Sequence, residues 1–102
     1  MKKVNGRIYR TDGTREFFEC DKEESLEKLQ AIVGGLIQVV YLLDNLDEQK
    51  EEFGKGNDLI VNEEGLLLDL PKNPWSRFLT LDTRWENEIF RGDIVLIHGM
   101  LD

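Results

Sequence analysis

Residues 24–43 read ESLEKLQAIVGGLIQVVYLL, a stretch in which a helix pattern passes directly into a strand pattern. The first half predicts a helix over residues 24–33, because its apolar side chains recur at the spacing of one helix face. Gly34-Gly35 is expected to end this helix, since glycine adopts the left-handed conformation at little cost. Residues 36–43 are apolar on both faces, which predicts a strand inside a sheet. The helix stripe consists of Leu26, Leu29, Ile32 and Val33.

The residues before this helix predict a hairpin. Residues 7–10 and 15–20 have strand character, and Asp12-Gly13 between them is a strong turn signal. Either Asp21 or Ser25 is expected to cap the helix that follows.

The residues after the helix and strand predict smaller elements. Residues 44–58 are acidic and predict a solvated excursion. Residues 59–62 and 66–70 predict a second hairpin, residues 75–79 a short helix, and residues 94–98 a final apolar strand. This order favours an α+β fold with one main helix packed on a mostly antiparallel, strongly twisted sheet or half-barrel.

The chain of 102 residues has the length of one domain, 40% hydrophobic residues and 33% charged residues. We therefore expect a single domain over residues 1–102 with a core of its own.

The net charge of the chain indicates which classes of partner are disfavoured. The chain has 13 Lys and Arg against 21 Asp and Glu, a net charge of −8, and residues 31–70 hold nine of the acids with only two bases. Such a surface repels phosphate backbones and anionic membranes, so neither nucleic acid nor membrane is expected as a direct partner. Solubility alone is the other interpretation of this acidity. The expected partner-binding residues are Asp44, Asp47, Glu48, Glu51, Glu52 and Asp58.

Cysteine usage and the first residues bear on the compartment. Cys20 is the single cysteine, so no internal disulfide is expected. The start of the chain turns polar at once and has no apolar signal segment. We expect a cytoplasmic protein.

Catalytic and metal chemistry find little support in the sequence. His98 is the single histidine and no Gly-x-Ser-x-Gly elbow is present, so no catalytic residue is expected. One cysteine and one histidine do not make a structural zinc site. The acids of residues 44–58 leave calcium open, although the EF-hand spacing is absent. No metal or cofactor is predicted.

A candidate ligand site remains at Asn62, Asn73, Trp75 and Arg77, which offer amide donors and acceptors, a flat apolar face and a planar cation. The alternative is structural for each residue. Both asparagines flank turns and can cap backbone groups, Trp75 can belong to the core, and Arg77 can balance nearby acids.

Four motifs in order resemble one family: residues 29–37 (LQAIVGGLI), 61–65 (VNEEG), 70–74 (LPKNP) and 92–97 (GDIVLI). The ordered set resembles the small proteins grouped as domain of unknown function 3846, over about residues 25–97. The resemblance implies a bacteriophage or mobile-element setting and supplies no catalytic residue.

Three functions follow from these observations. The first is a non-enzymatic phage accessory protein that binds and blocks a host component, with a counter-defence role, through its acidic surface. The second is a small-ligand binder such as a sponge for a signalling nucleotide. The third, a hydrolase of unrecognised type, would need titratable groups that converge on a pocket. A homodimer is a further expectation, since small sheets often complete their burial with a symmetric copy.

Overall fold

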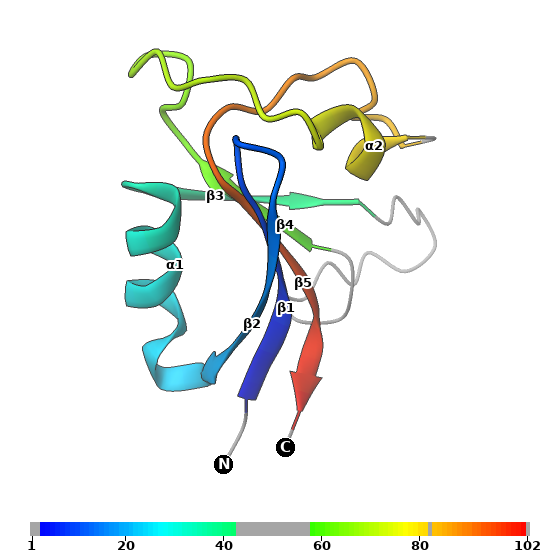
Figure 1. The fold of residues 1–102 in the computed structure, drawn as a ribbon. Coiled ribbons are helices and arrows are strands. Elements are labelled where there is room, and N and C mark those ends of the chain that lie inside the picture. Colours follow the sequence, from blue (N-terminus) through cyan, green and yellow to red (C-terminus); the bar gives the residue numbers. More distant parts are fainter. Residues whose placement is uncertain (1–2, 43–57, 82, 102) are drawn as a thin grey trace.

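The computed structural model describes residues 3–42, 58–81 and 83–101. They form a five-stranded sheet in the order β2-β1-β5-β4-β3, in which every neighbouring pair is antiparallel. β2 and β3 are edge strands, so the sheet is not closed (Figure 1). The predicted α+β class and mostly antiparallel sheet are confirmed. The strands are β1 (Lys3–Tyr9), β2 (Arg15–Asp21), β3 (Ile37–Tyr41), β4 (Asp58–Asn62) and β5 (Ile94–Leu101).

One helix covers one face of the sheet, and a second helix packs near the other face together with the chain around it. α1 (Ser25–Val33) follows a short 3-10 turn, Lys22–Glu24, and lies on one face (Figure 1). α2 (Ser76–Thr80) lies near the other face with the chain that follows it. The expectation of one main helix therefore describes α1 and leaves out the covering of the second face. Neither helix in the described part of the chain has the length and apolar character that a bilayer crossing requires.

The sheet buries a core on each side. The core under α1 contains Val4, Ile8, Phe18, Cys20, Leu29, Val33, Ile60, Val95 and Ile97. The core under α2 contains Tyr9, Val40, Leu59, Val61 and Ile94, with Trp75, Leu79, Trp85 and Phe90 packed against it. Side chains of a strand point alternately to the two faces, so β4 and β5 supply both cores.

The first hairpin forms as predicted. Arg10 N–H donates to the carbonyl of Thr14 (2.8 Å), and Gly13 turns the chain at φ 92°. The Asp12 carboxylate accepts hydrogen bonds from the hydroxyl of Thr14 (2.6 Å) and from its backbone N–H (2.9 Å). These bonds hold the pKa of Asp12 below its usual value, the hydroxyl bond contributing most.

Of the two predicted ends of α1, the C-terminal end is confirmed and the N-terminal cap is not. Gly34 ends the helix at φ 85° and donates its N–H to Gln30 (2.9 Å), as expected. No side chain caps the start: Asp21 makes no capping bond, and the Ser25 hydroxyl donates to the Lys22 carbonyl (2.8 Å). The capping prediction is wrong because the intervening 3-10 turn supplies backbone partners instead.

The interior strand was assigned to the wrong segment. β3, within residues 36–43, is an edge strand with a single fully buried residue, Val40. β4 is the strand that is covered on both faces, and all five of its residues are buried. The order of strands decides this, because β5 pairs with β4 and leaves β3 at the rim.

The predicted second hairpin is also wrong. β4 already pairs with β3 on one side and β5 on the other, so no edge remains for residues 66–70. That segment forms consecutive turns instead. The short helix over residues 75–79 and the final strand over residues 94–98 are confirmed as α2 and β5. The acidic excursion lies outside the described residues except for Asp58, which begins β4.

β1 and β5 approach unusually closely at Gly6. The register of the two strands shifts between Asn5 and Gly6. A Cβ added to Gly6 would overlap the carbonyl oxygen of Leu96 and lie 3.0 Å from the Cα of Ile97. Both obstacles are backbone atoms of a central strand, so they cannot turn aside as a flexible side chain would.

We therefore predict that Gly6→Ala lowers the unfolding free energy by about 2 kcal/mol or more, since the two central strands must separate to admit the methyl group. Urea unfolding followed by circular dichroism measures the change. Arg7→Ala on the same strand is the control, because its half-buried side chain does not face this contact. Equal unfolding midpoints for Gly6→Ala and the wild type would contradict the close approach.

Candidate functional site

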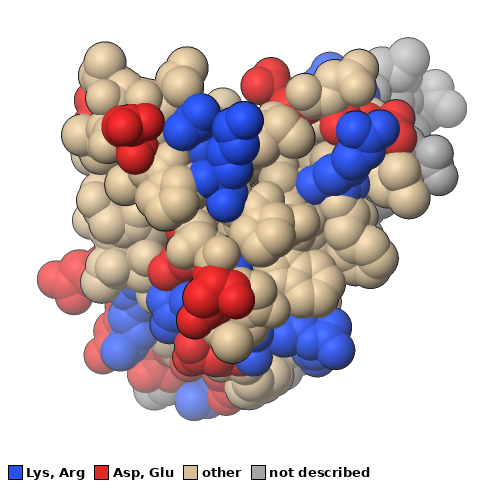
Figure 2. Space-filling view, turned by 45° about the horizontal axis from the view of Figure 1, so that its top comes forward, with Lys and Arg blue, Asp and Glu red and all other residues tan. Residues whose placement is uncertain are grey.

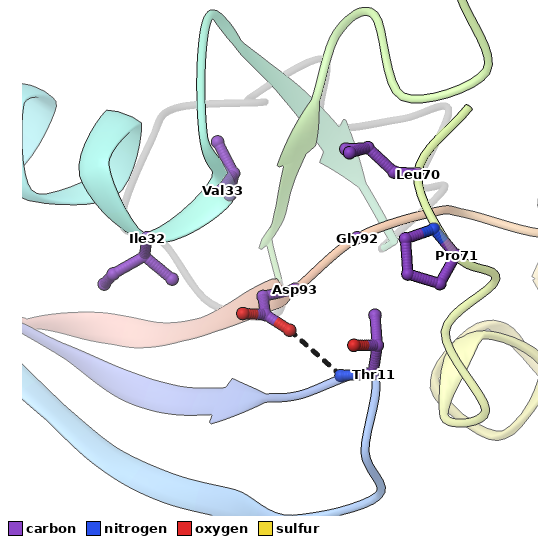
Figure 3. A pocket seen from close by; sticks show the side chains of 7 residues that line it. All are labelled: Thr11, Ile32, Val33, Leu70, Pro71, Gly92 and Asp93. Carbon is purple, nitrogen blue, oxygen red and sulfur yellow. Dashed lines mark hydrogen bonds between the residues drawn. The ribbon is translucent and has the colours of Figure 1, made fainter. Parts of the chain in front are cut away.

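A shallow pocket of about 180 Å³ lies where the end of α1, the β1–β2 loop and the start of β5 meet (Figure 3). Most of its walls are apolar or backbone, and the carboxylate of Asp93 with the hydroxyl of Thr11 gives it a polar side. The lining residues are Thr11, Ile32, Val33, Leu70, Pro71, Gly92 and Asp93.

Asp93 is held by two donors. Its Oδ1 accepts the N–H of Thr11 and its Oδ2 accepts from Arg10 Nη1, each at 2.9 Å. Arg10 also donates to Glu16 through Nε (2.9 Å), so one guanidinium bridges two carboxylates. The bond to Glu16 and then the bond to Asp93 raise the pKa of Arg10. Asp93 therefore fixes the β1–β2 loop against the start of β5 and brings a carboxylate to the pocket.

Asn73 is a buried structural residue. Its Nδ2 donates to the carbonyls of Tyr9 and Gly92, each at 2.9 Å, and its Oδ1 accepts the N–H of Trp75 (2.8 Å). The side chain thus joins the end of β1, the start of β5 and the start of α2, and only 3% of the residue is exposed. This network satisfies three polar atoms at once, as a buried amide requires.

Asn62 makes a similar link at the C-terminal end of α1. Its Nδ2 donates to the Val33 carbonyl (3.0 Å), which satisfies a helix-end acceptor, and its Oδ1 accepts the N–H of Glu64 (2.7 Å). The exposed fraction is 5%. The second bond is an Asx turn that starts the loop after β4.

Trp75 and Arg77 differ in burial. Trp75 packs on Tyr9 with ring centroids 5.3 Å apart, donates Nε1–H to the Gly13 carbonyl (3.1 Å), and carries the guanidinium of Arg15 over its ring. Arg77 is exposed on α2. The amides of both asparagines are engaged in different backbone links, and neither residue lines the pocket. A ligand role for this set stays a prediction.

The expected partner-binding acids divide between two settings. Asp58 is buried at the start of β4, with 3% of the residue exposed, so it does not present an outward carboxylate. Glu63, Glu64 and Asp69 are exposed and are not among the expected partner-binding residues. Figure 2 shows Asp and Glu lying next to Lys and Arg over the face drawn, so both signs alternate there. The other five, Asp44, Asp47, Glu48, Glu51 and Glu52, lie outside the described residues.

The loop after β4 carries an exposed apolar run that the sequence reasoning missed. We call residues 63–69 (EEGLLLD) the leucine loop. Leu66, Leu67 and Leu68 are 76%, 80% and 51% exposed. The signal was present as three leucines between acids, but the strand interpretation placed them in a sheet.

Cys20 and His98, the single cysteine and the single histidine of the chain, lie in different settings. Cys20 is buried in the core under α1, and burial raises the pKa of its thiol, which keeps it protonated. His98 is exposed on β5. Among the described residues, no group of three or more His, Cys, Asp and Glu is placed to hold a metal ion.

These features define a small α+β domain: an open antiparallel sheet with a helix on each face, a shallow acid-bearing pocket and an exposed leucine loop. The chain belongs to the family described as Domain of unknown function (DUF3846), whose model matches residues 6–101. The match reaches further toward the N-terminus than the four sequence motifs do, and so includes residues 6–9 of β1, which pairs with β5 at the centre of the sheet. No curated protein and no solved structure matches the chain.

We predict that Asn73→Ala lowers the unfolding free energy by about 2–4 kcal/mol, because two carbonyls and one amide lose their buried partner. Denaturant unfolding measures it, with the exposed Asn87→Ala as the matched control. Wild-type stability for Asn73→Ala would show that this residue does not fasten the sheet to α2.

Proposed function

We propose that the chain is a non-enzymatic accessory protein that binds and blocks a protein of a bacterial host, in the cytoplasm and in the setting of a bacteriophage or mobile element. The observation that carries the proposal is the segregation of charge, with nine of the 21 acids and two of the 13 bases in residues 31–70. Phosphate backbones and anionic membranes carry the same sign as the chain, so a basic protein surface is the favoured partner.

Within residues 31–70, the exposed acids that the structure describes lie on a loop with a well-defined backbone, which supports the proposal. Glu63, Glu64 and Asp69 are exposed on the leucine loop, whose backbone is closed by its own hydrogen bonds. Because the backbone is fixed in this way, binding a partner costs little ordering of the loop, and the exposed carboxylates speed the encounter with a basic surface.

The proposal predicts that binding to a host protein weakens steeply with salt. Raising the salt from ~0.1 M to ~1 M shortens the Debye length from ~10 Å to ~3 Å, so exposed charges no longer attract one another across the interface. The immobilised chain is exposed to a bacterial lysate at both concentrations, and retained proteins are quantified by mass spectrometry.

Two charge variants with the same net change sharpen this experiment. The first variant removes five negative charges within residues 44–52, and at low salt it should retain roughly threefold less of the partner than the wild type. The control variant removes five negative charges outside residues 31–70 and should retain as much as the wild type. Retention that is equal at both salt concentrations, or no retained protein at all, contradicts the proposal. The first variant changes Asp44, Asp47, Glu48, Glu51 and Glu52 to their amides, and the control changes Glu23, Glu24, Glu27, Glu86 and Glu88.

The pocket favours a second candidate function, the binding of a small ligand. Its lining offers apolar contact and one carboxylate and includes no lysine or arginine, so it suits a small neutral or cationic molecule better than a polyphosphate. A signalling nucleotide would have to find its phosphate contacts outside this lining.

A thermal-shift screen tests this second candidate. Small amines should raise the melting temperature of the wild type and leave Thr11→Phe unchanged, because the larger side chain occupies the pocket. The melting temperature of Thr11→Phe without ligand checks that the variant folds. Nucleotides tested alongside should give no shift, and a nucleotide that stabilises the wild type would contradict this assignment of ligand class.

A further inference from the structure

The leucine loop differs from the other exposed apolar side chains because its three leucines are consecutive. Single exposed apolar residues are ordinary in soluble proteins, whereas a contiguous exposed run marks an interaction site. In Figure 1 the chain after β4 projects beyond the sheet on the side of α1. The remaining large hydrophobic side chains that are exposed are Phe17, Leu26, Leu36, Phe78, Leu81 and Ile89.

The backbone of this loop is tied within itself. Leu68 N–H donates to the Glu64 carbonyl (2.8 Å), Asp69 to Leu66 (3.0 Å), and Leu70 to Gly65 (3.0 Å). Asn62 fixes the start of the loop by accepting the N–H of Glu64.

Two contacts fix the far end of the loop. Arg91 donates to the Leu70 carbonyl (2.9 Å), and Asp69 adopts a positive φ of 55° to close the turn. The leucines are therefore presented by a fixed scaffold, and binding them costs little ordering of the backbone.

Carboxylates border the leucines on both sides. Glu63 and Glu64 precede them, and Asp69, with 96% of its side chain exposed, follows. Arg91 lies 3.6 Å from Asp69 with its side chain only 22% exposed, and the exposed Lys72 pairs with Arg91 in a backbone bridge. Three carboxylates and two cations therefore border the leucines, and the balance of charge around them is negative. A complementary surface has an apolar hollow with basic side chains around it.

Charge also disfavours two other binding partners of the leucine loop, a second copy of the chain and an anionic membrane. In a symmetric contact between two copies, the same acids would face one another around the leucines, which is unfavourable. An anionic membrane surface would repel the same rim. Of these surfaces, an apolar hollow with a basic rim is the one that complements both the leucines and the acids.

We infer that the leucine loop is the docking element of this protein, and that it inserts Leu66 and Leu67 into an apolar hollow, rimmed by lysine and arginine, on the partner protein. The inference rests on the proposed function, because it names the part of the chain that makes the contact and the chemistry of the surface that receives it.

The test compares matched pairs of substitutions in the full chain. Leu66→Ser with Leu67→Ser should lower retention of the partner from bacterial lysate at least ~10-fold, as for anchors at the centre of an interface. Leu81→Ser with Ile89→Ser removes two other exposed apolar side chains and should bind as wild type. Both double variants should melt near the wild-type temperature, since Leu66 and Leu67 lie largely in solvent, Leu81 and Ile89 are about half exposed, and none of the four belongs to either core.

A photo-crosslinking amino acid at position 67 then identifies the receiving surface, with position 81 as the control site. Crosslinks from position 67 should fall on apolar residues of the partner that lie beside lysine or arginine. Crosslinks that fall on an acidic or wholly polar surface would overturn the inference.

The outcomes separate the inference from the proposed function. If the wild type retains a partner in a salt-dependent way and the Leu66 and Leu67 double variant retains it equally, the docking element lies elsewhere and the proposed function stands. If the wild type retains nothing, the proposed function fails and the inference with it. A concentration-dependent dimer in sedimentation, lost only in this double variant, would show that a second copy occupies the loop and would overturn the inference.

Discussion

The pairing of β1 with β5 is the constraint on which the rest of the structure depends. Residues from opposite ends of the sequence meet at the centre of the sheet, and Gly6 lets the two backbones come into direct contact. With β5 in that position, β4 is enclosed on both sides and both faces. The two cores and the pocket follow from that placement, since each contains residues of β5 or of the turn that leads into it.

Apart from the start of α1, elements set by local chemistry could be read from the sequence, and elements set by distant pairing could not. The Asp12-Gly13 turn, the Gly34 helix end and α2 depend on neighbours within a few residues, and all three appear where expected. The assignment of the interior strand failed because it depends on which strand lies next to β5. Residues 36–43 are the longer apolar run, yet the five residues of β4 take the enclosed position.

The candidate site residues likewise divide into local features that the sequence predicts and distant contacts that it does not. The structural alternative for Asn62 and Asn73 could be stated from the sequence, because asparagine beside a turn commonly bonds the backbone. The residues that each one joins could not be stated, since Asn73 reaches Tyr9 across 64 positions of the chain. Asp93 was not singled out, because a single Gly-Asp before a strand gives no sign that Arg10 and Thr11 will meet it. The leucine loop was misread because an apolar run predicts burial only where a strand edge is free to receive it.

The position of β5 in the sheet also affects synthesis on the ribosome. β5, which separates β1 from β4 in the sheet, leaves the exit tunnel after the other four strands. Until then only the β1–β2 and β3–β4 hairpins have their partners, and the apolar faces destined for both cores stay uncovered. Until β5 inserts between them, the two hairpins thus expose apolar surface of the kind that chaperones bind.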